Sequence, residues 1–271
     1  MPELPEVETT RIGIAPYVLG EEITDVIIRD RRLRWPVPRQ LKSNLVNTTI
    51  RKLYRRAKYL VFQTEKGHML IHLGMSGSLR ILTGNLPPEK HDHADFVFSS
   101  GTRLRFHDPR RFGCILWTDK DPAQHKLMTS LGPEPLDAGF NGEYLFNKSR
   151  KRSQSIKTFI MDSRIVVGVG NIYANEALFT AGILPNRKAG TISKERYNKL
   201  AKSIKEILQK ALRKGGTTLR DFVNGEGKPG YFRQELKVYD RADLPCYICN
   251  SLLKVKRIGQ RSTFYCNTCQ H

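Results

Sequence analysis

The stretch Cys246-Tyr247-Ile248-Cys249, followed after sixteen residues by Cys266-Asn267-Thr268-Cys269, decides the fold of the C-terminal part of the chain. The two residues inside each pair allow one tight turn to aim both thiols at the same point. Four thiolates then complete a tetrahedral shell around zinc, with no position left open for water. Such a site stabilises a fold and cannot activate water, so we expect one structural Zn2+ bound by Cys246, Cys249, Cys266 and Cys269.

The segment between the two cysteine pairs predicts a β-hairpin. Residues 252–256 and 262–265 have the composition of strands, and a turn is expected at 258–260. The hairpin would present the cations Lys254, Lys256, Arg257 and Arg261, each of which on its own could equally be a solvated surface charge.

The fifth cysteine, Cys114, stands apart within the apolar run 114–117. A disulfide framework would distribute cysteine pairs along the chain of a secreted protein, whereas four of these five lie in the last 26 residues. We therefore expect metal binding by the cluster and ordinary core packing for Cys114.

The charge of the chain indicates a polyanionic partner. Its 271 residues include 46 Lys and Arg against 26 Asp and Glu, a formal net charge of +20, and the pI is about 9.9. Neutralising phosphates releases counterions, so nucleic acid is the polyanion that this surplus favours. The alternative is a charge that only keeps the protein soluble.

The sequence predicts neither a membrane protein nor a secreted one. No apolar run is long enough to span a bilayer, and residues 1–8 are acidic and contain proline, unlike a secretory signal. We expect a soluble, cytoplasmic protein.

Residues 23–117 have a largely β pattern. Residues 59–63 and 69–73 predict one hairpin across the turn-prone Lys66-Gly67, and residues 96–98 and 104–106 predict a second. Several short strands at this spacing are typical of a sandwich or barrel.

Helical patterns flank this β region. A helix over 7–19 should end at Gly20, and residues 119–150 are expected to be rich in loops, with a boundary at 132–135. Beyond that boundary, apolar residues recur at helical spacing. The expected helices contain residues 156–160, 171–180 and, after Ser193 as N-cap, 197–212.

The N-terminal sequence Pro2-Glu3-Leu4-Pro5-Glu6 allows covalent chemistry. Once Met1 is removed, Pro2 carries a secondary amine that can attack an electrophilic carbon and form an iminium ion. An N-terminal amine has a reference pKa of about 7.7–8.0, so part of it is unprotonated at neutral pH. While Met1 remains, the same nitrogen is an inert amide. From this motif alone, prolines that only stiffen the entry to the first helix are an equal alternative.

Seven blocks of sequence resemble the bacterial formamidopyrimidine-DNA glycosylases, which repair oxidised purines, across nearly the full length of the chain. They are residues 1–9 (MPELPEVET), 56–60 (RAKYL), 72–77 (HLGMSG), 90–93 (KHDH), 108–113 (DPRRFG), 167–173 (VGVGNIY) and the cysteine module.

The resemblance implies an α+β protein with an N-terminal β-sandwich flanked by helices, a helix–two-turns–helix domain and a zinc finger, with DNA bound in the cleft between. On this basis we expect a catalytic domain over 1–133, a DNA-binding domain over 134–240 and a zinc finger over 241–271.

The resemblance also implies a reaction. Pro2 would attack the sugar carbon that bears the damaged base and form a Schiff base, and the Glu3 carboxyl would protonate the sugar-ring oxygen. Successive β and δ eliminations would then cut the strand on both sides. Lys58 would donate a proton and contact a phosphate, and Arg261 would assist the second elimination. By residue type alone, Glu3 could be a first-turn helix carboxylate and Lys58 a solvated strand lysine.

A base must leave the stack to be excised, and the resemblance implies that Met75, Arg110 and Phe112 fill the gap, with Arg110 reading the cytosine opposite the lesion. Core packing is the alternative for Met75 and Phe112. Further DNA contacts are implied for His72, His91, Arg152 and Asn171. His91 and His93 could also suggest a metal, but no arrangement of carboxylates or cysteines that would complete a metal site with them stands out nearby.

The loop 225–231 corresponds to the segment that closes over the extruded base in this family. The chain departs from the family pattern at Ser163, Asp240 and Asn250, which puts lesion preference and local turn geometry in doubt. The expected partner is duplex DNA with an oxidised purine opposite cytosine, bound by a monomer at the bacterial nucleoid.

Three other functions would each explain part of the sequence. An endonuclease VIII-type enzyme for oxidised pyrimidines usually has glycine at the position of Leu4. A non-catalytic damage-binding protein on the same scaffold would need neither Pro2 nor Glu3. A zinc-ribbon RNA-binding or transcription factor explains only the last 40 residues or so.

Overall fold

The computed structural model describes residues 2–84, 86–217 and 232–271. Two compact units form, and each is described by itself. Unit 1 contains Met1–Thr129 and Lys214–Arg233, and unit 2 contains Ser130–Arg213 and Gln234–His271. Among the described residues, no helix is both long and apolar enough to cross a membrane.

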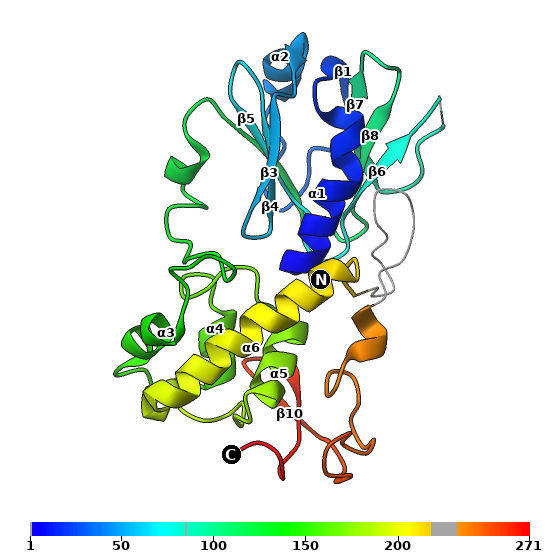
Figure 1. The fold of residues 1–271 in the computed structure, drawn as a ribbon. Coiled ribbons are helices and arrows are strands. Elements are labelled where there is room, and N and C mark those ends of the chain that lie inside the picture. The colour runs from blue at the N-terminus through cyan, green and yellow to red at the C-terminus, as the bar shows by residue number, and fades with distance from the viewer. Residues whose placement is uncertain (1, 85, 218–231) are drawn as a thin grey trace. The chain divides into compact units, whose positions relative to one another are not determined.

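Unit 1 contains two antiparallel sheets (Figure 1). The first has the order β2-β1-β7-β8-β6, and the second has the order β3-β4-β5-β9. The strands of the first sheet are β1 (Glu22–Ile28), β2 (Thr48–Thr49), β6 (Ser78–Leu82), β7 (Asp92–Phe98) and β8 (Arg103–His107). Those of the second are β3 (Lys52–Arg56), β4 (Tyr59–Gln63), β5 (His68–His72) and β9 (Cys114–Thr118).

Both predicted hairpins are confirmed. Strands β4 and β5 pair with Tyr59 opposite His72, and β7 and β8 pair with Phe96 opposite Leu104. Between β4 and β5, Gly67 adopts a φ of 150°, where a Cβ would lie 2.6 Å from the carbonyl oxygen of Thr118, so this turn requires glycine.

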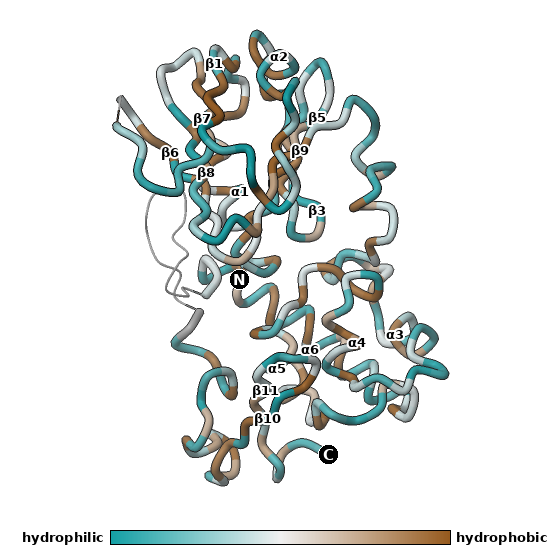
Figure 2. The backbone as a smooth tube through the Cα atoms, turned by 180° about the vertical axis from the view of Figure 1, so that it is seen from behind, coloured by the Kyte–Doolittle hydropathy of each residue, from teal (hydrophilic) through white to brown (hydrophobic). Residues whose placement is uncertain are grey.

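The core of unit 1 lies between the sheets and beneath helix α1 (Leu4–Val18), which packs against β3, β4 and β6. Val7, Ile14 and Val18 of α1 join apolar side chains of both sheets there. The apolar stretches of β1 and β9 are brown in Figure 2. A short helix, α2 (Leu41–Leu45), and a 3-10 turn, η1 (Pro122–Gln124), complete the unit. Cys114 is 2% exposed and is one of the buried apolar residues, as predicted.

Helix α1 begins three residues earlier than the sequence predicted, at Leu4 rather than Val7. Pro5 lies within its first turn, where a missing backbone N–H costs nothing because those groups have no partner inside the helix. Glu3 is the N-cap, and the Glu6 side chain accepts a hydrogen bond from the Glu3 backbone N–H.

Unit 2 is built from helices with a small hairpin. The helices are α3 (Gly142–Ser149), α4 (Ile156–Met161), α5 (Asn171–Thr180) and α6 (Lys194–Arg213), with the 3-10 turn η2 (Ala189–Thr191). A further 3-10 turn, η3 (Phe232–Glu235), spans the point at which the chain passes from unit 1 to unit 2. Helix α6 packs against α3 and α5, and α5 packs against α4 and strand β11. The hairpin consists of β10 (Lys254–Ile258) and β11 (Arg261–Tyr265).

Helix α6 confirms the predicted helical spacing of apolar residues over 197–212. Tyr197, Leu200, Ile204 and Leu208 are buried on one face, and the Arg196 backbone N–H donates to the Ser193 hydroxyl at the N-cap. Helix α3, in contrast, was missed, because residues 119–150 were expected to be rich in loops. The predicted hairpin strand over 252–256 was placed two residues too early.

Candidate functional site

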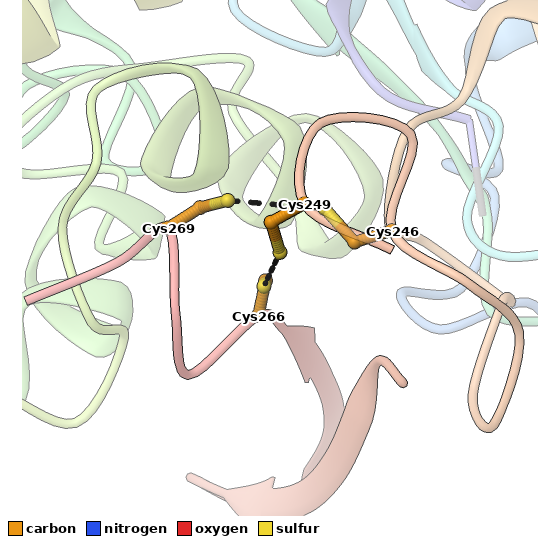
Figure 3. Close-up of side chains that lie close together, drawn as sticks. All are labelled: Cys246, Cys249, Cys266 and Cys269. Carbon is orange, nitrogen blue, oxygen red and sulfur yellow. Dashed lines mark hydrogen bonds between the residues drawn. The ribbon is translucent and has the colours of Figure 1, made fainter. Parts of the chain in front are cut away.

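The four cysteines of the C-terminal module meet as predicted (Figure 3). Their sulfur atoms all lie within 4.8 Å of one another, with 3.9 Å from Cys246 to Cys269 and 3.4 Å from Cys249 to Cys266. A tetrahedral zinc with bonds of about 2.3 Å separates its sulfurs by about 3.8 Å. A disulfide needs about 2.05 Å. The set therefore fits one zinc ion and forms no disulfide.

The cysteine module packs on helix α5. Phe264 and Leu253 form a small core with Phe179 of α5, and the Phe264 backbone N–H donates to the Asn175 side chain at 2.8 Å. Glu176 accepts hydrogen bonds from the backbone N–H groups of residues 237–239 at 2.8–2.9 Å. Burial raises the pKa of this carboxyl, and the three amides oppose the shift. The hairpin is thereby fixed to the helix that starts at Asn171.

Arg261 is exposed at the first position of β11, and the residue after it is held firmly. The fully buried Lys157 donates to the Ser262 carbonyl at 3.0 Å and to the Thr263 hydroxyl at 2.7 Å. The Asn171 amide also donates to the Ser262 carbonyl, at 3.1 Å. A buried ammonium requires such partners, so Lys157 fixes the strand that carries Arg261.

The predicted nucleophile lies at the start of α1 in unit 1. Pro2 is buried, and Glu3 is 2% exposed. Glu6 secures this end of the chain, since one carboxylate oxygen accepts the Glu3 N–H at 2.9 Å. The other oxygen accepts the backbone N–H and the hydroxyl of Thr217 at 2.8 and 2.9 Å. Gly216 has a φ of 80°, which favours glycine, and a Cβ there would lie 2.9 Å from this carboxylate.

Lys58 follows Ala57, whose φ is 55°, in the turn between β3 and β4. Its neighbour Tyr59 lies against the ring of His72, with centroids 4.8 Å apart. The half-buried His72 accepts the Gly74 backbone N–H on Nδ1 at 2.9 Å. Burial lowers the pKa of His72 to about 4, with added repulsion from the charges of Lys58 and Arg34. Nδ1 is therefore unprotonated at neutral pH, and Nε2 carries the ring proton.

Met75, Arg110 and Phe112 come together in unit 1. The Arg110 guanidinium contacts the Met75 sulfur at 3.0 Å and lies over the Phe112 ring at 5.2 Å. Phe112 is 47% exposed, so the core-packing alternative is wrong for this residue. Met75 is half-buried in the turn after β5, and Arg110 is exposed.

The remaining predicted DNA contacts are distributed over both units. His91 is half-buried with a φ of 82° in unit 1, and His93 is buried with its Nε2 2.8 Å from the Asp108 carbonyl. In unit 2, Arg152 is exposed after α3, and Asn171 is the first residue of α5. Within the described part of the chain, the four cysteines are the one group suited to a metal, so no metal cluster forms at His91 and His93.

Sequence reasoning missed three buried residues that support these groups: Glu6, Asp108 and Lys157. Only Glu6 had a readable signal, because a carboxylate three residues after the N-cap is a capping box. The predicted loop over 225–231 lies outside the described residues.

Comparison with known proteins gives two family matches. Residues 1–115 match the formamidopyrimidine-DNA glycosylase N-terminal domain, and residues 131–223 match the formamidopyrimidine-DNA glycosylase H2TH domain. The chain is 56% identical over 270 residues to the formamidopyrimidine-DNA glycosylase of Methylococcus capsulatus, covering 100% of both chains.

Two similar solved structures contain damaged DNA. A variant of Lactococcus lactis Fpg with Fapy-dG-containing DNA superposes with a TM-score of 0.92 at 32% identity, covering 100% of both chains. A MutM complex with carbocyclic 8-oxo-G-containing DNA gives 0.92 at 33% identity, again over 100% of both chains.

Proposed function

The chain belongs to the formamidopyrimidine-DNA glycosylase family, and we propose that the amine of Pro2 performs its reaction. The protein is a bifunctional DNA glycosylase and AP lyase that removes oxidised purines, 8-oxoguanine and formamidopyrimidines, in base excision repair. The observation that carries the assignment to Pro2 is the N-terminus itself. Pro2 and Glu3 are consecutive buried residues at the start of α1, and the Glu6 carboxylate accepts the Glu3 backbone N–H.

The first half of the reaction exchanges one bond to the sugar for another. The unprotonated Pro2 nitrogen attacks C1′, the damaged base leaves, and the Glu3 carboxyl protonates O4′ as the sugar ring opens. The attacking nitrogen gives up its N–H proton once the C1′–N bond has formed, and the departing base takes up a proton. Ring opening then leaves a C1′=N iminium ion, which stays positively charged because the Pro2 nitrogen has no second hydrogen to lose.

The second half cuts the strand twice. The iminium acidifies C2′–H; loss of this proton expels the 3′ phosphate, and a second elimination expels the 5′ phosphate. Lys58 supplies a proton donor and a phosphate contact, and Arg261 stabilises the charge that develops on the phosphate in the second step. Water then releases the sugar fragment from Pro2.

Extrusion of the damaged nucleotide is assigned to Met75, Arg110 and Phe112. An exposed aromatic ring with a methionine and an arginine beside it suits insertion into a base stack, and the guanidinium can read the cytosine opposite the lesion. His72 contributes a neutral Nε2–H to a phosphate, a role that His91, Arg152 and the start of α5 at Asn171 share. The proposed partner is duplex DNA with an oxidised purine opposite cytosine, bound by a monomer.

The zinc ion has a structural part in this scheme. When bound by Cys246, Cys249, Cys266 and Cys269, it ties the ends of the β10–β11 hairpin together and so supports Arg261. We assign residues 1–133 to catalysis, 134–240 to DNA binding and 241–271 to the zinc finger. Four reduced thiols suit the cytoplasm, where the bacterial nucleoid supplies the substrate.

The test is borohydride reduction of the protein with duplex DNA that carries 8-oxoguanine opposite cytosine. Wild-type protein without Met1 should give a covalent adduct that maps to Pro2. Pro2→Gly should slow excision and strand cleavage while DNA binding persists, and Pro5→Gly is the matched control because it changes the same helix entry without touching the amine. No adduct with protein that lacks Met1, or an adduct at a lysine, would contradict the assignment. Loss of DNA binding in Pro2→Gly would make Pro2 structural.

A further inference from the structure

Two turns of unit 1 carry the three residues assigned to base extrusion. Met75 lies in the turn 73–77 after β5, and Arg110 and Phe112 lie in the turn 108–113 before β9. The backbones of these turns touch. A Cβ on Gly74 would lie 2.4 Å from both the Phe112 carbonyl carbon and the Gly113 nitrogen, so the turns contact each other without side chains between them.

The carboxylate of Asp108 accepts hydrogen bonds from both turns. Asp108 is fully buried, and its Oδ1 accepts the Ser76 hydroxyl at 2.9 Å. Its Oδ2 accepts the Gly113 backbone N–H at 2.8 Å, and the Arg110 backbone N–H approaches Oδ1 at 3.3 Å. Ser76, which follows Met75 in the first turn, and Arg110 and Gly113 of the second turn therefore all donate to the same carboxylate.

The Asp108 backbone is fixed as well. Its carbonyl lies 2.8 Å from Nε2 of the buried His93, and its N–H donates to the His91 carbonyl at 3.1 Å. His93 belongs to β7, a strand of the first sheet, so the backbone of Asp108 is anchored to that sheet. Its carboxylate, in contrast, bonds to Ser76 in the turn after β5, a strand of the second sheet.

We propose that Asp108 is a positioning residue that holds Met75, Arg110 and Phe112 as one preformed wedge. This proposal rests on the assignment of those three residues to base extrusion. The two oxygens of the Asp108 side chain accept from all three donors that approach them, the Ser76 hydroxyl and the backbone N–H groups of Arg110 and Gly113, so one side chain bonds to both turns at once. Without it, the two turns lose their shared partner, and the three inserting groups no longer keep a fixed spacing.

A fixed spacing matters because extrusion breaks the stacking and pairing of the damaged base, and the wedge offsets that loss only if its three members enter together. Displacements near 1 Å reduce rates of oriented reactions by about a hundredfold. Asp108→Asn keeps the size of the side chain, but its NH2 group faces a backbone N–H in either orientation, that of Arg110 beside the Ser76 hydroxyl or that of Gly113, and this donor loses its acceptor.

The experiment compares two substrates for each variant without Met1. The first is duplex DNA with 8-oxoguanine opposite cytosine or adenine, which requires extrusion. The second is a single-stranded oligonucleotide with an abasic site, which reaches Pro2 without extrusion and is trapped by borohydride. Asp108→Asn should slow single-turnover excision from the duplex by about tenfold to a hundredfold and reduce the preference for cytosine. Trapping on the single strand should stay within about twofold of wild type.

Two further variants make the result specific. Asp95→Asn changes an equally buried carboxylate of the same unit, bonded to Arg29 and Arg105 rather than to the turns, and should leave the ratio of the two rates unchanged. Ser76→Ala removes one of the three donors and keeps the Asp108 side chain, so it should lower duplex excision by a smaller factor even if Asp108→Asn does not fold.

The outcomes separate the two proposals. Unchanged duplex excision and cytosine preference in both Asp108→Asn and Ser76→Ala would overturn the role of Asp108, as would an equal loss on duplex and single strand. Failure of wild-type protein to be trapped at Pro2 on the single strand would instead overturn the proposed function, because that substrate does not need the wedge.

Discussion

Acidification should weaken unit 1 through His72. In the folded protein the pKa of this ring is lowered to about 4 by burial and by the charges of Lys58 and Arg34, whereas the unfolded chain has the ordinary value of 6.5. The unfolded state therefore binds a proton between these values and the folded state does not. By linkage, this contribution to stability is complete above pH 6.5 and is lost as the pH falls towards 4.

The size of the effect follows from the two pKa values. Between pH 7.5 and pH 5, integrating the linkage relation gives a loss of at most about 2 kcal/mol of unfolding free energy. The matched variant is His72→Asn, because its side-chain oxygen can still accept the Gly74 N–H but does not titrate in this range.

Urea denaturation followed by tryptophan fluorescence measures this effect in the correct unit, because both tryptophans, Trp35 and Trp117, lie in unit 1. The difference in unfolding free energy between wild type and His72→Asn should change by up to about 2 kcal/mol across the pH range. The titration of other groups cancels in this difference. A difference that stays constant within about 0.5 kcal/mol would refute the argument, because His72 would then titrate as in the unfolded chain.

Three further perturbations act on unit 2. Cys266→Ser should release zinc and expose residues 241–271 to rapid hydrogen exchange, while the unfolding of unit 1, measured by tryptophan fluorescence, stays unchanged. Zinc that remains bound to this variant would contradict the four-cysteine site. Lys157→Met should destabilise the β10–β11 hairpin by about 1–3 kcal/mol, measured by hydrogen exchange of residues 254–265, and an unaltered hairpin would show that Lys157 does not hold it. Ile204→Ala, at a buried position of α6, should lower the free energy of unfolding by about 2–4 kcal/mol, measured by circular dichroism in urea. The exposed Lys202→Ala should lower it by less than about 0.5 kcal/mol, and equal losses in the two variants would place Ile204 outside the core.

Local patterns predicted the parts of the fold that local physics determines. The register of β4 and β5 follows from short apolar strands on either side of Gly67, and α6 follows from apolar residues at helical spacing after Ser193. The zinc site follows from the spacing of two cysteine pairs. In these cases residues close together in the sequence are enough to specify the structure.

Elements that depend on tertiary contacts were missed. Helix α3 has only eight residues, too few to be stable alone, and forms because it packs on α6. Its polar sequence therefore reads as a loop, although Asn141 caps it through a hydrogen bond to the Tyr144 N–H.

The candidate site divides in the same way. Pro2 and Glu3 could be proposed from a motif, but Asp108 and Lys157 could not, because their importance lies in partners from distant segments. Lys157 bonds to Thr263, 106 residues away, and Asp108 bonds to Ser76, 32 residues away. The residues next to Lys157 and Asp108 in the sequence do not indicate these partners.

The hydrogen bonds from Thr217 to Glu6 span 211 residues, and this separation imposes an order on events during synthesis. The ribosome adds about 5–20 residues per second, so for about ten seconds or more Glu6 has been made and Thr217 has not. During that interval the first residues lack one of the contacts that later enclose them. Removal of Met1, on which the proposed role of the Pro2 amine depends, can therefore take place before Glu6 has received its two hydrogen bonds from Thr217.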